Sequence, residues 1–455
     1  ADAAFGASSR TANEKFRTEA EELGRAVNEV NRAEVANRLP GFTGVLKTYI
    51  DTYGIWMKGA GCRVQDNHVV VPADAYPNTW GRGGIRFWDD EGSAIWNIAA
   101  ALEWLELFLP GFTVDPLLGI TETLFDGNEV IRGAAHGVEI REIEDFAWGL
   151  PDLRIQNNQV QGMAGAGILV DEEALAVGVD IAGNDISGCS TDPTRAQVAG
   201  AQGGIVVRNA AFCRVTDNTV TCMSAPHEEL YVFGIDLETV YDGVVSSCHV
   251  LHNEREPEEG NEAAASESLT GANAETGMWS ELLVTNAIIV LPQAYYGAIR
   301  VLQPAGQLAI RGNDARLVHT GYGVLVSVGA TNENRAALYH PLREAVSSYD
   351  NSITIPGVPQ VEVSCQSNQV EFMREVETYA YLLHQITSLN FSGNTSSSTG
   401  TAWGTLMVIG DGVVSHNMLS GIRIANMSRG VVLGNVADIS DITVAPAVQV
   451  AYNVW

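Results

Sequence analysis

Charged residues recur at fixed places in a repeated phrase of this sequence, where they could act as acids, bases or anion-binding groups. Each phrase is a Gly followed by alternating apolar residues, as in GIRFW (84–88), GILV (167–170) and GIDLE (234–238). Side chains of a strand alternate between its two faces, so these residues predict two outward-facing columns. The first column is Arg86, Glu139, Leu169, Val206, Asp236 and Arg300, and the second is Trp88, Arg141, Asp171, Arg208, Glu238 and Leu302.

The second column allows two interpretations. Its charges alternate in sign from Arg141 to Glu238, which predicts a ladder of exposed cross-strand ion pairs, each contributing roughly 0.2–1 kcal/mol. The alternative is a carbohydrate groove that uses the carboxylates as acid and base. Asp171 and Glu238 would lie roughly 10 Å apart, just beyond the roughly 6.5–9.5 Å of an inverting glycosidase. Asp236 and Glu238, on one strand, form a second candidate pair.

The neighbouring residues of these columns are candidates for ligand contact. Arg208 could bind an acidic sugar or lower the pKa of a nearby carboxyl. Arg86, Arg141 and Arg300 could also bind substrate, and Trp88 could stack on a sugar ring. No zinc-protease, serine-hydrolase, P-loop or EF-hand spacing occurs. The sequence therefore predicts no metal site and no cofactor, with calcium left as a possibility that no motif indicates.

A second repeated phrase determines which elements would position these columns. LRIQNNQV (153–160), VDIAGNDI (179–186) and CRVTDNTV (213–220) each place an Asn between β-branched residues. Asn tolerates the left-handed turn conformation, so the phrase predicts strand, Asn turn, strand, with stacked amides forming a ladder. Cys248 stands where an Asn is expected. The predicted ladder is Asn67, Asn128, Asn158, Asn184, Asn218, Asn313, Asn368, Asn394, Asn417 and Asn435.

Repeats of this kind resemble the right-handed parallel β-helix of the pectin-lyase-like superfamily, over roughly residues 60–450. The resemblance implies an all-β fold: a single-stranded right-handed parallel β-helix (β-solenoid) with an N-terminal α-helical cap and helical or loop insertions. Lyases, hydrolases, phage tailspikes and structural parts all share this fold, so it implies no particular activity.

The family's catalytic motifs are largely missing. Polygalacturonase-like members carry NTD, Asp-Asp, GHG and RIK segments, whereas this chain has only Asp89–Asp90, with His136 in AAHGVEI nearest to the histidine element. Pectate-lyase-like members use calcium-binding carboxylates and an Arg base. Asp171, Asp180 and Glu238 near Arg208 could be imagined in those roles, but no local motif specifies them.

The chain divides into a predicted helical cap region (1–58) and a parallel β-helix (59–455) with insertions at about 91–121, 252–284 and 328–352. The cap is favoured over an oligomerisation stalk because the apolar seam of residues 16–30 spans only two heptads. The insertion at 252–284 begins as an acidic, loop-like stretch. The end of the chain is strand-like without a visible cap, which predicts a covering partner, a neighbouring molecule or missing residues.

The segment AIWNIAAALEWLELFLPGF (94–112) is apolar on most sides and must be buried. Packing against its own solenoid is favoured, with a partner's surface as the alternative. The residues predicted to contact such a partner, or a second copy, are Trp96, Leu102, Trp104 and Phe108.

Charge and apolar content limit the classes of partner. With 26 Lys+Arg against 55 Asp+Glu, the net charge is −29, which argues against nucleic acid and anionic membrane surfaces. No stretch reaches the roughly 18 apolar residues of a membrane span. Six scattered Cys predict buried fillers rather than a disulfide framework.

These observations favour a non-catalytic acidic β-helix, a structural or recognition component that is extracellular, at a cell surface or on a particle, with polysaccharide as one ligand. The first alternative is a carbohydrate-active enzyme, a polysaccharide lyase or glycoside hydrolase. The second is a tailspike-like receptor-binding trimer, which requires the N-terminal helix to associate.

Overall fold

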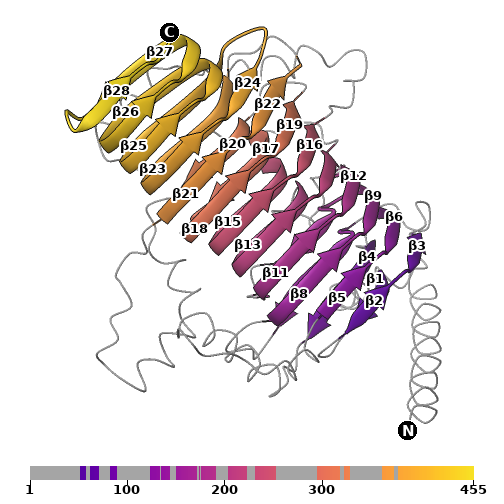
Figure 1. Cartoon of the computed structure of the whole chain (residues 1–455). Coiled ribbons are helices and arrows are strands. Elements are labelled where there is room, and N and C mark those ends of the chain that lie inside the picture. Colours follow the sequence, from indigo (N-terminus) through magenta and orange to yellow (C-terminus); the bar gives the residue numbers. More distant parts are fainter. Residues whose placement is uncertain are drawn as a thin grey trace, which may run out of the picture. The chain divides into compact units, whose positions relative to one another are not determined.

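The computed structural model describes residues 52–57, 62–70, 82–89, 123–133, 135–143, 150–171, 174, 176–190, 203–222, 231–252, 295–317, 322–327, 361–373 and 378–454. Contacts divide the chain into two units, and the described residues form the second, Tyr53–Ala73 with Arg82–Trp455, together with Thr52. This unit is a stack of coils in which each strand pairs in parallel with its equivalents in the coils before and after (Figure 1). The predicted parallel β-helix is therefore confirmed.

Each coil has three faces. Face A consists of β2 (Arg63–Gln65), β5 (Thr123–Asp126), β8 (Leu150–Gln156), β11 (Ala176–Ala182), β18 (Ala305–Arg311), β21 (Val361–Gln366), β28 (Val448–Ala451) and the C-terminal parts of β13 (Gly203–Thr216), β15 (Tyr231–Ser246), β23 (Thr378–Ser392), β25 (Ala402–Ser415) and β26 (Met418–Leu433). Face B consists of β3 (His68–Val70), β6 (Glu129–Gly133), β9 (Gln159–Met163), β12 (Asp185–Cys189), β14 (Thr219–Cys222), β16 (His249–His252), β19 (Asp314–Leu317), β22 (Gln369–Phe372), β24 (Thr395–Ser397) and the first residues of β26 and of β27 (Val436–Val444).

Face C carries the two predicted columns. It consists of β1 (Thr52–Met57), β4 (Arg82–Asp89), β7 (Val138–Ile143), β10 (Ile168–Val170), β17 (Tyr295–Leu302), β20 (Tyr322–Ser327), the N-terminal parts of β13, β15, β23 and β25, the middle part of β26 and the later part of β27. In the long strands residues in the left-handed region mark the bend from face C to face A: Asn209 and Phe212 (both φ 54°) in β13, and Gln385 (φ 58°) in β23. The bend is thus made without a loop.

Apolar side chains from all three faces fill the interior, because alternation along each strand turns every second residue inward. Phe125, Ile155, Ile181 and Val215 stack in register on face A and are all fully buried. Among the described residues Cys189, Cys213, Cys248 and Cys365 are buried without a disulfide. Burial raises the pKa of Cys189 and Cys213 to about 12, so these thiols act as apolar fillers.

All ten Asn of the predicted ladder lie at the turn between faces A and B. Asn158 Nδ2, for example, donates to Asn184 Oδ1 at 2.9 Å and to the Phe125 carbonyl oxygen at 2.9 Å. The left-handed residue is the one before each Asn, as at Asn157 (φ 54°). The prediction that the ladder Asn itself adopts this conformation is therefore wrong: the preceding residue makes the turn, and the Asn follows it with its amide buried in the ladder.

The ladder departs from prediction at its C-terminal end and contains the expected break at Cys248. Asn453 extends it, since Asn435 Nδ2 donates to Asn453 Oδ1 at 2.9 Å. At Cys248 the amide is replaced by a thiol, which lies 3.9 Å from Asn218 Nδ2. The backbone N–H of Cys248 still donates to Asn313 Oδ1 at 3.0 Å, so the ladder resumes one coil later.

The predicted cap and insertions fall mostly on residues outside the described ranges. No α-helix occurs among the residues that the structure describes, and the predicted helical cap lies outside them. β1 begins at Thr52, within the 1–58 range assigned to the cap region, and hydrogen-bonds to β4. The insertions at 91–121, 252–284 and 328–352 fall between β4 and β5, β16 and β17, and β20 and β21, and apart from His252 their residues are outside the described ranges.

Candidate functional site

Face C brings the two predicted columns into register. Along the first column, the residues that oppose each other on adjacent strands are Arg86 and Glu139, Glu139 and Leu169, Leu169 and Val206, Val206 and Asp236, and Asp236 and Arg300. In the second column Trp88 pairs with Arg141, Arg208 with Glu238, and Glu238 with Leu302. The side chain of Trp88 lies outside the described residues, so its predicted stacking role stays a prediction.

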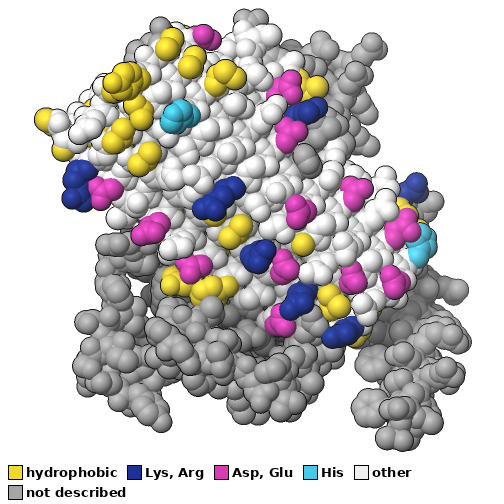
Figure 2. All heavy atoms as spheres, viewed as in Figure 1, with side chains coloured by type: hydrophobic (Ala, Val, Ile, Leu, Met, Phe, Trp, Pro, Cys, Tyr) yellow, Lys and Arg dark blue, Asp and Glu magenta, His cyan; other side chains and the backbone are white. Residues whose placement is uncertain are grey.

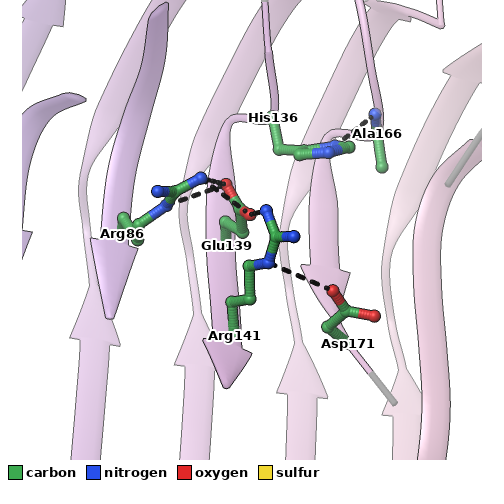
Figure 3. Close-up of polar contacts among 6 residues, drawn as sticks. All are labelled: Arg86, His136, Glu139, Arg141, Ala166 and Asp171. Carbon is green, nitrogen blue, oxygen red and sulfur yellow. Dashed lines mark hydrogen bonds and ion pairs between the residues drawn. The ribbon is translucent and has the colours of Figure 1, made fainter. Parts of the chain in front are cut away.

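The first charged cluster surrounds Glu139 (Figure 3). Arg86 Nη2 lies 3.1 Å from Glu139 Oε1, and the two side chains are only 8% and 1% exposed. Arg141 extends between two carboxylates, 3.7 Å from Glu139 Oε1 and 3.7 Å from Asp171 Oδ2. Arg141 and Asp171 remain partly exposed, at 42% and 20%. The cluster is a chain of alternating charges in which Glu139 contacts two guanidinium groups.

His136 adjoins this cluster at the bend that precedes β7. It is buried, and its Nδ1 accepts a hydrogen bond of 3.0 Å from the Ala166 N–H (Figure 3). Burial lowers the pKa of His136 below 6.5, although the nearby Glu139 carboxylate acts in the opposite direction. His136 is therefore neutral near pH 7 with its proton on Nε2, and its ring orientation is set by the backbone of the next coil.

The second charged cluster surrounds Asp236. Arg300 Nε and Nη2 donate to the two Asp236 oxygens at 2.7 and 2.6 Å, and both side chains are buried. The Arg300 guanidinium also lies 5.1 Å from the centre of the Phe233 ring, a cation–π distance. Beside this pair, Arg208 Nε lies 3.8 Å from Glu238 Oε2, with side chains 20% and 35% exposed. Each carboxylate in this cluster thus has a guanidinium partner.

The two clusters are separated by an apolar group of Ala166, Leu169 and Val206, all buried. Asp171 and Glu238 each have their own Arg partner on an adjacent coil. The second column is therefore ion-paired and partly exposed. Burial of the first column was not expected, and Arg86 and Arg300, candidates for substrate contact, are enclosed in ion pairs. Burial is tolerated there because each charge exchanges water for an oppositely charged hydrogen-bonding partner.

A patch of aromatic residues continues face C beyond the charged clusters. We define the aromatic patch as the buried cluster of Phe233, Tyr322, Leu325, Tyr379, Leu382, Trp403 and Met407. The rings of Tyr322 and Tyr379 stack with centroids 5.8 Å apart and planes 5° apart. The Arg423 guanidinium lies 4.8 Å from the centre of the Trp403 ring, and Arg423 Nε lies 3.2 Å from Asp441 Oδ2.

Three buried polar atoms at this patch have no hydrogen-bond partner: His384 Nδ1, Trp403 Nε1 and Thr405 Oγ1. None of these residues was a candidate in the sequence, because the columns were followed only to Arg300 and Leu302. Register extends the first column through Leu325, Leu382, Thr405, Arg423 and Asp441. The sequence did contain a signal that could have identified these coils. Gly404 and Gly421 each lie one or two residues before a residue of the first column, as the glycines of the earlier coils do. The 328–352 insertion interrupts that spacing.

His384 makes stability depend on pH. Burial lowers its pKa from 6.5 to about 4, so between pH 6.5 and 4 the unfolded chain binds more protons than the folded one. The unfolding free energy therefore falls as pH is lowered through this window. At about 1.4 kcal/mol per pKa unit, wild type should lose about 2–3 kcal/mol more than His384→Leu between pH 7 and 4.5. Urea unfolding at both pH values measures this, and equal losses would contradict it.

The part of the chain that the structure describes contains neither a cluster of metal-binding side chains nor a membrane-spanning helix. No group of three or more His, Cys, Asp or Glu in the described ranges is placed to hold a metal ion. Among the same residues, no helix has the length and apolar character needed to cross a lipid bilayer.

The fold and the face just described define the chain as a parallel β-helix repeat protein. Residues 118–315 match the family described as right-handed beta helix region. This match extends from just before β5 into β19 and favours a fold of the pectin-lyase-like kind. No curated protein and no solved structure matches the chain significantly.

Proposed function

We propose that this protein is a non-catalytic β-helix that serves as a rigid structural or recognition component, with face C as its recognition surface. The observation that carries the proposal is the ion pairing of every candidate carboxylate on face C. Glu139 and Asp236 are buried against Arg86 and Arg300, and the partly exposed Asp171 and Glu238 also face guanidinium groups.

Acid–base chemistry requires a carboxyl group that can reach the proton it transfers. Asp236 is 3% exposed, and both of its oxygens accept hydrogen bonds from Arg300. This geometry supports a structural role for the Asp236–Arg300 pair rather than the role of nucleophile, acid or base. Asp171 and Glu238 retain solvent access, so the enzyme hypothesis, a polysaccharide lyase or glycoside hydrolase, depends on these two residues.

Exposed apolar side chains support a contact with a protein partner. They gather on the C-terminal coils, over the part of the view where β25 to β28 are drawn (Figures 1 and 2). Scattered exposed apolar residues are ordinary, whereas a concentration of them is typical of an interaction surface. The exposed residues are Val413, Met418, Val436, Ile439, Val450, Tyr452 and Val454.

Several sequence predictions about partners and location remain part of this proposal. Trp96, Leu102, Trp104 and Phe108 lie outside the described residues, and their contact with a partner stays a prediction. An extracellular, cell-surface or particle-associated location agrees with the net charge of −29. The tailspike-like alternative requires a trimer, so a monomer in light scattering would exclude it.

The proposal is tested by a screen of polysaccharides and oligosaccharides read for both binding and product release, with and without calcium. The comparison protein carries Asp171→Asn and Glu238→Gln, which are partly exposed positions. Asp236 is left intact, because breaking its buried pair would confuse loss of activity with loss of folding.

We expect no product release from wild type under either calcium condition. Product release that the Asp171→Asn/Glu238→Gln protein lacks would replace the proposal with the enzyme hypothesis and locate the site. Product release that persists in the variant would also overturn it, and would place the chemistry elsewhere in the chain.

A further inference from the structure

Three unpaired polar atoms lie close together on the outward side of face C. Trp403 and Thr405 are two residues apart on β25. Because Leu406 points into the core, alternation along the strand turns both of them outward. Thr405 is in register with Leu382, and His384 follows Leu382 by two residues on the adjacent β23. Buried polar groups normally have hydrogen-bond partners, and each exception costs free energy. Three exceptions at neighbouring positions of one face indicate a place where a ligand supplies the partners.

The hydrogen-bonding types of these atoms restrict the ligand. The indole Nε1 of Trp403 can only donate, whereas the Thr405 hydroxyl can donate and accept. His384 is neutral near pH 7, because burial lowers its pKa to about 4, so its ring offers one donor and one acceptor. The ligand must therefore offer an acceptor to Trp403, while Thr405 and His384 can each face a donor or an acceptor. Hydroxyl groups, which both donate and accept, meet all three demands.

The walls of the site are aromatic and carry no excess charge. Tyr379 is in register with Trp403 and stacks on Tyr322. Arg423, whose guanidinium lies over the Trp403 ring, is paired with Asp441. Aromatic walls with a few placed polar groups are typical of small-molecule sites. An anionic ligand would have to compete with Asp441 for Arg423, which favours an uncharged one.

The site borders open surface at the next coils. Arg423 is the in-register neighbour of Thr405 and is 20% exposed on its side chain, and its partner Asp441 is 58% exposed. Ile439 on β27 is also exposed. An ion pair with access to solvent contributes little free energy, so moving the Arg423 guanidinium off the face of Trp403 would cost little.

We propose that this part of face C binds one ring of a neutral saccharide, with Trp403 packing against the ring and with Trp403, Thr405 and His384 hydrogen-bonding its hydroxyl groups. The inference rests on the recognition function proposed above and assigns its ligand class. It places the ligand on the coils of β23, β25 and β26, away from the charged clusters that the sequence indicated.

The test uses Thr405→Val and Trp403→Phe, which retain side-chain size or aromatic packing and remove one polar atom each. Because these atoms have no partner in the unliganded protein, neither variant should lower the urea midpoint of unfolding. Binding to an array of neutral oligosaccharides, followed by calorimetry with the best ligand, should weaken at least about tenfold in each. If the Trp403 or Thr405 atom served only folding, its removal would not weaken saccharide binding while leaving the urea midpoint unchanged.

Matched controls are Thr219→Val, an exposed Thr on face B, and Trp56→Phe, an exposed Trp on β1. Both should bind as wild type does. Neutral-saccharide binding that survives Thr405→Val and Trp403→Phe would overturn this site while leaving the recognition function intact. Binding of uronate oligosaccharides alone, or no binding by wild type, would overturn the ligand class and leave the structural role. Product release would instead overturn the non-catalytic function.

Discussion

Arg300→Met is expected to lower the unfolding free energy by about 3–5 kcal/mol, because it leaves the Asp236 carboxylate buried without its counter-charge. The carboxylate accepts two hydrogen bonds from Arg300, at 2.7 and 2.6 Å, and both side chains are nearly inaccessible to water. Urea unfolding followed by circular dichroism, with refolding checked, measures the loss. A cost of this size would support the structural role proposed for the Asp236–Arg300 pair.

The chain contains a matched control for this experiment. Arg429 and Asp411 form a pair of the same geometry, with distances of 2.6 and 2.7 Å, but their side chains are 72% and 51% exposed. Arg429→Met should therefore cost no more than about 1 kcal/mol. The double variant Asp236→Leu/Arg300→Met should recover most of the loss, since it removes both buried charges. Equal costs for Arg300→Met and Arg429→Met would contradict the role assigned to burial.

Asn184→Ala is expected to destabilise the protein by about 3 kcal/mol or more, because it removes four ladder hydrogen bonds and leaves buried groups unpaired. Asn184 Nδ2 donates to the Ile155 carbonyl oxygen at 2.8 Å and to Asn218 Oδ1 at 2.9 Å. Its Oδ1 accepts from the backbone N–H and the Nδ2 of Asn158, both at 2.9 Å. The same urea measurement applies, with constant dependence on urea as the check that the unfolding transition is unchanged.

The break at Cys248 supplies a variant of opposite sign. Cys248→Asn should place an amide between Asn218 and Asn313 and add about 1 kcal/mol of stability. The position is suitable because the Cys248 thiol already lies 3.5 Å from the Val215 carbonyl oxygen, where a ladder amide would donate. Destabilisation by Cys248→Asn, or a neutral Asn184→Ala, would show that the amides contribute little beyond the backbone pairing of the coils.

Most of the coil could be predicted from sequence because its determinants are local. Slipping a strand by one residue would turn its apolar side chains out of the core, so residues such as Ile85 and Ile235 determine their own register. The same alternation placed Arg208 beside Glu238 on adjacent coils, as the structure has them. The ladder was equally predictable, because an Asn that recurs between β-branched residues once per coil indicates turns that stack on one another.

Burial and ligand chemistry, in contrast, depend on the tertiary structure. Arg86 and Arg141 look alike in sequence, yet Arg86 is buried on Glu139 and Arg141 remains partly exposed. Thr405 and Trp403 became candidates only when register carried face C across the 328–352 insertion, whose length hides the spacing. By itself the sequence determined the repeat, the inward residues and the Asn turns, because these follow from strand alternation. Only the tertiary structure decided which polar groups are paired and which stay unpaired, because exposure depends on neighbours distant in the chain.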